Sequence, residues 1–103
     1  MQMSVDDMRG SANEACNVLA ALGNPHRLLI LCQLLDGEKR VSDLLPITGI
    51  SQSLLSQHLA RLRRDGLVKT RRESQAIFYS LNSPETARLI ETLYDIYCHD
   101  DRN

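Results

Sequence analysis

The sequence lacks the features of membrane and secreted proteins. It has no apolar run of about 18 residues and no charged-then-apolar leader, so we expect a soluble cytoplasmic protein with no membrane partner. Its three cysteines are an odd number without framework spacing, which argues against a secreted disulfide scaffold. In a reducing cytosol these thiols start free, so we expect any disulfide to be regulatory rather than structural.

Catalytic motifs are also missing. The chain has no glycine-rich phosphate loop, no G-x-S-x-G element and no clustered pair of carboxylates. Cys98 and His99 are adjacent in sequence, which seldom gives the geometry of a nucleophile and its base. We therefore expect no enzyme and no cofactor. Without repeats or linkers, the 103 residues suit one domain, 1–103, with a modest core.

Helical spacing of apolar residues predicts two helices before the middle of the chain. The first covers about 5–22 and ends at Gly23. Asn24-Pro25 then supplies an N-cap followed by proline at N1, where its missing N–H costs nothing. The second helix is expected to continue to about Leu35, before Asp36-Gly37 breaks it.

Two further short-range signals predict a third and a last helix. The third covers about 42–48 and contains Pro46, which normally removes a hydrogen bond and kinks a helix. Ser83-Pro84 caps the last helix, which ends at about Cys98. Between these helices, residues 41–72 carry the pattern that is most informative about function.

A tight turn at Gly49 and an N-cap at Ser51 introduce a helix that ends before Gly66. Leu55, Leu59 and Leu62 recur at i, i+4 and i+7 and are expected to face a core. Short hydrogen-bonding side chains then remain near the N-terminal half of the helix, where they suit base edges in the major groove of DNA. These candidate base-reading residues are Ser51, Gln52, Ser53, Ser56, Gln57 and His58.

Two β-rich runs follow, over 67–72 and 76–81, with a tip at Glu73-Ser74-Gln75. The order ααααββα predicts a mainly α winged helix-turn-helix with a small hairpin wing. Residues 51–75 hold six basic and two acidic residues, so this segment carries +4 while the rest of the chain carries −5. The expected contacts to phosphate or to the minor groove come from Arg61, Arg63, Arg64, Lys69, Arg71, Arg72 and Gln75.

The first and last helices are both amphipathic. The core of a winged helix can be completed without one of the apolar faces of these two helices, so some apolar surface is left over. Pairing them across a two-fold axis would bury this surplus apolar surface and set two recognition helices one DNA turn apart. We therefore expect a homodimer on double-stranded operator DNA. The alternative is that both helices pack on their own core. A winged helix used purely for protein contacts is also open, and would lack salt-dependent DNA affinity.

The sequence resembles the ArsR/SmtB family of winged-helix repressors over nearly the whole chain. The matching segments are 21–28 (ALGNPHRL), 55–59 (LSQHL), 62–68 (LRRDGLV) and 77–81 (IFYSL). Residues 31–34 (LCQL) and 93–98 (LYDIYC) are similar to the thiol-based BigR/SqrR/HlyU subgroup. The resemblance implies a DNA-binding dimer in which Cys32 and Cys98 form a sensing pair. Pro46 departs from the family pattern, and Cys16 lies outside it.

The resemblance predicts a redox switch: the reduced protein binds DNA, and a disulfide or polysulfide link between Cys32 and Cys98 releases it. The expected effector is a reactive sulfur species or an oxidant, although Cys32 also fits a small core residue. Cys98 sits at a helix C-terminus, where the dipole disfavours a thiolate, so a persulfide suits it better than a general peroxide. Metal sensing is the rival, but Asp95, Cys98 and His99 make half a site, so we predict no metal.

Overall fold

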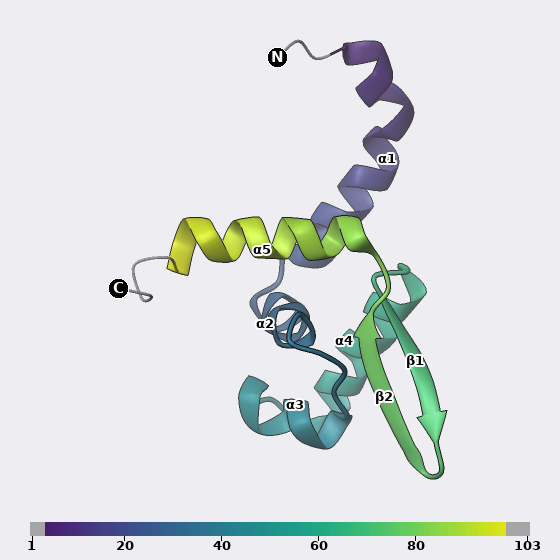
Figure 1. Cartoon of the computed structure of the whole chain (residues 1–103), viewed down its shortest axis with the longest axis vertical. Helices are drawn as coiled ribbons and strands as arrows, with labels where there is room; N and C mark the ends of the chain where they lie inside the picture. The colour runs from purple at the N-terminus through teal and green to yellow at the C-terminus, as the bar shows by residue number, and fades with distance from the viewer. Residues whose placement is uncertain (1–3, 99–103) are drawn as a thin grey trace.

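The computed structural model describes residues 4–98, and His99 lies outside them (Figure 1). Its order ααααββα confirms the predicted winged helix-turn-helix, and the strands form one antiparallel pair. The elements are α1 (Val5–Leu22), α2 (Pro25–Leu34), α3 (Val41–Thr48), α4 (Gln52–Arg64), β1 (Val68–Glu73), β2 (Ala76–Leu81) and α5 (Pro84–Cys98).

The core lies where α2, α3 and α4 meet the hairpin and the first half of α5. The three leucines of α4 that were expected to face inward, Leu55, Leu59 and Leu62, are fully buried. They pack in one cluster with Leu31 of α2 and Ile90 of α5. Burial of this face fixes the rotation of α4 about its axis, so the polar residues on its other face are directed outward.

Local capping explains where the helices begin and end. The side chain of Asn24 accepts hydrogen bonds from the backbone N–H groups of His26 and Arg27, which places Pro25 at N1 of α2. Ser51 caps α4 in the same way, through a 3.1 Å bond from the N–H of Leu54. Both caps were predicted from the sequence alone.

Pro46 is accommodated inside α3 rather than at its end. This helix starts at Val41, one residue earlier than expected, and Gly49 ends it in the left-handed region at φ 70°. The hydroxyl of Thr48 donates to the carbonyl oxygen of Leu44 at 3.0 Å, which reinforces the turn that contains the proline. The α3–α4 turn therefore forms as predicted despite the departure at Pro46.

The wing has a tighter tip than the sequence suggested. Glu73 pairs with Ala76 in the hairpin, so Ser74 and Gln75 alone make the turn, with Ser74 at φ 59°. The three-residue tip predicted over 73–75 was therefore wrong by one residue. A second difference is a backbone bridge between Lys39, in the α2–α3 loop, and Tyr79 on β2.

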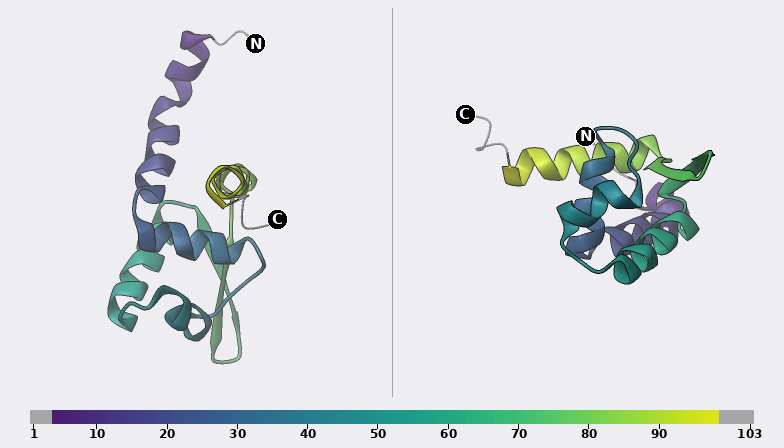
Figure 2. Two further views of the ribbon diagram at one scale, coloured as in Figure 1. Left: turned by 90° about the vertical axis from the view of Figure 1, so that its left-hand side faces the viewer. Right: turned by 90° about the horizontal axis from the view of Figure 1, so that it is seen from below.

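Helices α1 and α5 extend beyond the body formed by the other elements (Figures 1 and 2). Large apolar side chains on them are exposed, including Met8 at 56%, Leu19 at 59% and Tyr97 at 79%. Burial on α1 is confined to Ala21 and Leu22, at its C-terminal end. The alternative that both helices pack fully on their own core is therefore not what the chain adopts. No helix within residues 4–98 has the length and hydropathy needed to cross a membrane.

Candidate nucleic-acid interface and cysteine pair

The N-terminal end of α4 and the tip of the hairpin lie at the same end of the molecule (Figure 1). Five of the residues predicted to read bases, in the N-cap and the first two turns of α4, are exposed there. They are Ser51, Gln52, Ser53, Ser56 and Gln57. Their side chains offer hydroxyl and amide groups that can both donate and accept, as base edges require.

A surface hollow connects α4 to the wing. Gln52 and Gln75, which are far apart in sequence, line it together with Arg40, Ser42 and Ile77. Arg40 and Ser42 were not among the predicted interface residues, because the sequence pattern used for that prediction began at the N-cap of α4. Arg40 is the N-cap of α3 and Ser42 lies in its first turn, so their place at the start of the helix that precedes α4 was the available signal.

His58 occupies a different environment from the other residues predicted to read bases. It is half-buried, and its Nδ1 lies 3.4 Å from Nη1 of Arg27, while its ring centroid lies 5.9 Å from that of His26. Burial, followed by the positive charges of Arg27, His26 and Arg61, lowers the pKa of His58. A neutral His58 can accept a hydrogen bond from Arg27 through Nδ1.

Arg27 is a buried arginine that the sequence analysis did not single out. Its Nε donates to the carbonyl oxygen of Ala21 at 2.8 Å, and its Nη2 donates to that of Ala20 at 3.2 Å. It thereby satisfies carbonyl groups at the end of α1 while contacting α4 through His58. A signal existed, because Arg27, Leu31 and Leu34 fall on one helical face at i, i+4 and i+7.

The His58 environment predicts a pH dependence of stability. Because folding lowers the pKa of His58, the folded state binds fewer protons than the unfolded state below pH ~7. This contribution is complete above the ordinary histidine pKa and is lost as pH falls through the lowered one. Thermal melts between about pH 7 and 5 should therefore show a steeper loss of Tm for the wild type than for His58→Gln. Parallel Tm curves for the two proteins would contradict this assignment.

The predicted phosphate contacts differ in how free their charges are. The Nε atoms of Arg61 and Arg64 lie 3.5 Å and 3.9 Å from carboxylate oxygens of Asp65. Arg71 forms ion pairs with Glu38 and Glu73. Among the residues predicted to contact phosphate, Arg63, Lys69 and Arg72 make no ion pair with another described residue. Six cations on the segment therefore do not amount to six equally available phosphate contacts.

The two cysteines of the predicted sensing pair come from helices that pack against each other, α2 and α5. Cys32 and Cys98 are both half-buried free thiols. Burial raises the pKa of Cys32, and the nearby Cys98 adds a smaller electrostatic contribution in the same direction. Cys16 is an exposed thiol on another helix, α1. The structure therefore brings Cys32 and Cys98 within electrostatic range of each other.

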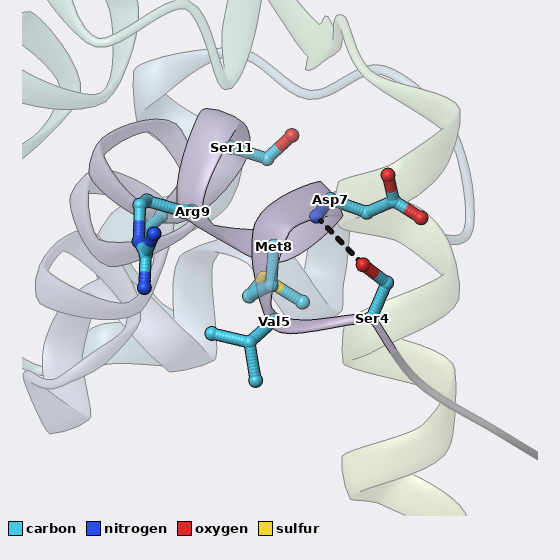
Figure 3. Close-up of a pocket in the computed structure, with 7 residues that line it drawn as sticks. Ser4, Val5, Asp7, Met8, Arg9 and Ser11 are labelled. Carbon is cyan, nitrogen blue, oxygen red and sulfur yellow. Dashed lines mark hydrogen bonds between the residues drawn. The ribbon is translucent and has the colours of Figure 1, made fainter.

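A shallow apolar pocket lies at the exposed end of α1 (Figure 3). The side chains of Val5 and Met8 form its apolar part, while the hydroxyl of Ser4 caps the helix by accepting from the N–H of Asp7 at 3.3 Å. No part of α2–α5 lines this pocket among the described residues. It is an open apolar surface on one helix rather than an enclosed ligand cavity.

A metal site is not formed by the described residues. Within residues 4–98 no three His, Cys, Asp or Glu side chains are grouped closely enough to hold an ion. Of the half-site weighed from the sequence, Asp95 and Cys98 are described and His99 is not. A site that includes His99 therefore lies partly outside the described residues.

Comparison with known proteins agrees with this architecture. Residues 24–70 match the sequence model of the bacterial regulatory protein, arsR family. The transcriptional activator HlyU of Vibrio cholerae is 49% identical over 93% of this chain and 89% of its own length. The structure of reduced HlyU from that organism superposes with a TM-score of 0.85, covering 91% of this chain and 99% of its own.

Two other solved structures share the fold. The transcriptional repressor BigR of Xylella fastidiosa is 44% identical, with a TM-score of 0.87 over 93% of this chain and 98% of its own. A homodimeric winged helix-turn-helix domain from Mycobacterium bovis is 29% identical, with a TM-score of 0.78 over 100% and 96% of the two chains. The fold, the polar face of α4 and these similarities together show that the chain belongs to the ArsR family of DNA-binding transcriptional regulators.

Proposed function

We propose that this regulator is a homodimer that binds a pseudo-palindromic operator when reduced and releases it when Cys32 and Cys98 become linked. The observation that carries the proposal is the placement of these two thiols on packed helices α2 and α5, with Cys98 close enough to affect the pKa of Cys32. A link between them would join α2, which packs in the core, to the end of α5, which extends outward from it.

Dimer formation is supported by the exposed apolar side chains of α1 and α5. A second copy covering Met8, Leu19 and Tyr97 would remove from water the apolar surface that the single chain leaves uncovered. Two copies of α4 would then be presented to successive major grooves, as in dimeric helix-turn-helix proteins. In this arrangement Gln52, Gln57 and their exposed neighbours read bases, while arginine and lysine side chains contact phosphates.

The chemistry that suits this cysteine pair is sulfur transfer. A raised pKa makes Cys32 a poor first nucleophile at neutral pH, so Cys98 attacks the outer sulfur of an organic persulfide and releases the corresponding thiol. The Cys32 thiolate then attacks the inner sulfur of the Cys98 persulfide. This second step forms the Cys32–Cys98 disulfide and expels hydrogen sulfide, so one persulfide oxidises both thiols.

The link is proposed to act by changing the spacing of the two recognition helices. To move the protein from mostly bound to mostly free, the operator affinities of the reduced and linked forms should differ by ~2–3 kcal/mol. A difference of that size corresponds to a change in Kd of about 30- to 150-fold. Because Cys32 adjoins the core that fixes α4, a small shift of α2 can be transmitted to the interface.

The test begins with a 30-bp duplex, hereafter the selected duplex, recovered by the reduced wild type from a random-sequence library. Binding is measured at one salt concentration, before and after treatment with an organic persulfide, and intact mass is recorded. We expect Kd to rise at least tenfold with loss of two protons, and we expect Cys32→Ser and Cys98→Ser to abolish the change. Cys16→Ser is the matched control and should respond like the wild type.

The opposite result would redirect the search. If the persulfide modifies Cys32 and Cys98 but Kd is unchanged, the pair is not a switch. If neither thiol reacts, the two residues are packing elements, and titration with Zn²⁺ would then test the remaining metal hypothesis at Asp95, Cys98 and His99. Failure to recover any duplex from the library would contradict operator binding itself.

Operator binding could activate transcription rather than repress it, and activation is the second candidate function. HlyU, at 49% identity, is a transcriptional activator, whereas BigR, at 44%, is a repressor. A regulator of this size can activate by displacing a silencing protein from overlapping DNA, with or without a sensor switch. Transcription in vitro from a promoter that carries the selected sequence, with and without a bound silencing protein, separates activation from repression by blocking polymerase.

A further inference from the structure

Arg71 has contacts that set it apart from the other basic residues of the wing. Its Nε and Nη2 donate to the two carboxylate oxygens of Glu38, at 2.8 Å and 2.5 Å, in a bidentate pair. Its Nη1 donates to Glu73 at 2.7 Å. The guanidinium also lies 4.4 Å from the centroid of the Phe78 ring, so its face and its three nitrogens are all engaged.

The positions of these partners follow from the backbone. Arg71 and Phe78 are directly opposite each other in the hairpin, so their side chains lie on the same face of the wing. Glu38 comes from the α2–α3 loop, where its neighbour Lys39 exchanges two backbone hydrogen bonds with Tyr79, at 2.9 Å and 2.8 Å. The loop therefore continues the sheet beside β2, and the Arg71–Glu38 pair joins that loop to β1 across it.

The charges of this cluster disfavour a phosphate contact by Arg71. One guanidinium faces two carboxylates, so the cluster carries −1 and a DNA phosphate would have to displace one of them. Donating hydrogen bonds to the carboxylates of Glu38 and Glu73 raises the pKa of Arg71, and accepting from Arg71 lowers the pKa of Glu38, so the Arg71–Glu38 pair remains charged at neutral pH. Arg72 is on the opposite face and makes no ion pair with another described residue.

We propose that Arg71 is a positioning residue, which pins the wing to the α2–α3 loop and so sets where Gln75 and Arg72 meet DNA. This inference rests on the proposed operator binding and assigns a different role to one residue within that surface. Glu38 is then the wing's anchor point on the body of the protein. Both residues act without touching DNA.

The direction in which Glu38→Gln changes the affinity for DNA distinguishes this role from a phosphate contact. If Arg71 positions the wing, Glu38→Gln should weaken binding to the selected duplex by about threefold, since an exposed pair of this kind contributes modestly. If Arg71 contacts phosphate and Glu38 restrains it, Glu38→Gln should strengthen binding. Asp36→Asn, in the same loop, is the matched control for removing one negative charge near DNA.

A charge reversal supplies the second arm. Arg71→Glu should weaken binding, and adding Glu38→Arg should restore Kd to within about twofold of the wild type, because the ion pair is re-formed with the same net charge. Loss of affinity that Glu38→Arg does not rescue would show that the cation is required at position 71 itself. That result would overturn the proposal.

A measurement without DNA separates this proposal from the proposed function. Hydrogen exchange of the Lys39 and Tyr79 amides reports on the backbone bridge directly. We expect about threefold faster exchange in Glu38→Gln and no change in Asp36→Asn. Unchanged exchange in Glu38→Gln would overturn the anchor even if operator binding is confirmed. Faster exchange in a protein that binds no duplex would contradict operator binding while leaving the anchor intact.

Discussion

The variant Leu19→Glu is expected to sediment as a monomer and to bind the selected duplex about a hundredfold more weakly than the wild type. Leu19 is 59% exposed on α1, so the substitution leaves the core intact. In the proposed dimer the new carboxylate would be buried against a second copy without a partner, which strongly disfavours association. Without association, the second half-site is no longer bound at high effective concentration.

Asn17→Glu is the control for this prediction. Asn17 is also exposed on α1 but lies away from the apolar stripe that contains Met8 and Leu19, so it should leave both association and Kd unchanged. Sedimentation equilibrium and fluorescence anisotropy at one salt concentration make the two measurements. A dimeric Leu19→Glu protein with wild-type affinity would show that α1 is not the dimer interface.

Leu59→Ala is expected to reduce the free energy of unfolding by about 2–5 kcal/mol. Leu59 is fully buried at the centre of α4, in contact with the cluster formed by the other helices and the wing. Truncation removes apolar contacts and leaves a cavity, because neighbours close over such a space only in part. For a chain of this length, Tm should fall by roughly 4–8 °C for each kcal/mol lost.

The matched control for this core variant is Leu54→Ala. Leu54 lies on the same helix and is 36% exposed, so its truncation should cost about 1 kcal/mol or less. Urea unfolding of both variants measures the difference. Equal losses for the two leucines would contradict the orientation of α4, and with it the assignment of the outward polar face.

Local signals predicted most of the fold because they act over a few residues. Asn24 and Ser51 cap their helices as expected, and the predicted bounds of the first helix, the second strand and the last helix agree with Val5–Leu22, Ala76–Leu81 and Pro84–Cys98. The phase of the α4 leucines predicted which face is exposed. These features need no knowledge of distant parts of the chain.

The environments of single charged residues were not predictable in this way. Arg71 was expected to contact DNA because it lies in a basic strand, whereas its partner Glu38 is 33 residues away in sequence. His58 was likewise grouped with the base-reading residues, although Arg27, 31 residues earlier, lies against its ring. The pairing of side chains that are far apart in sequence depends on tertiary packing. It cannot be predicted from the spacing of apolar residues along a helix or from composition.

The hairpin described above leaves the outer side of β1 without a neighbouring strand among residues 4–98. Such a side presents unpaired N–H and C=O groups, to which a strand of another molecule can add. Lys69 and Arg72, which make no ion pair with another described residue, place like charges along it, so two such strands would repel each other on approach. Neutralising Lys69 and Arg72 to weaken DNA binding is therefore expected to reduce the solubility of the protein as well.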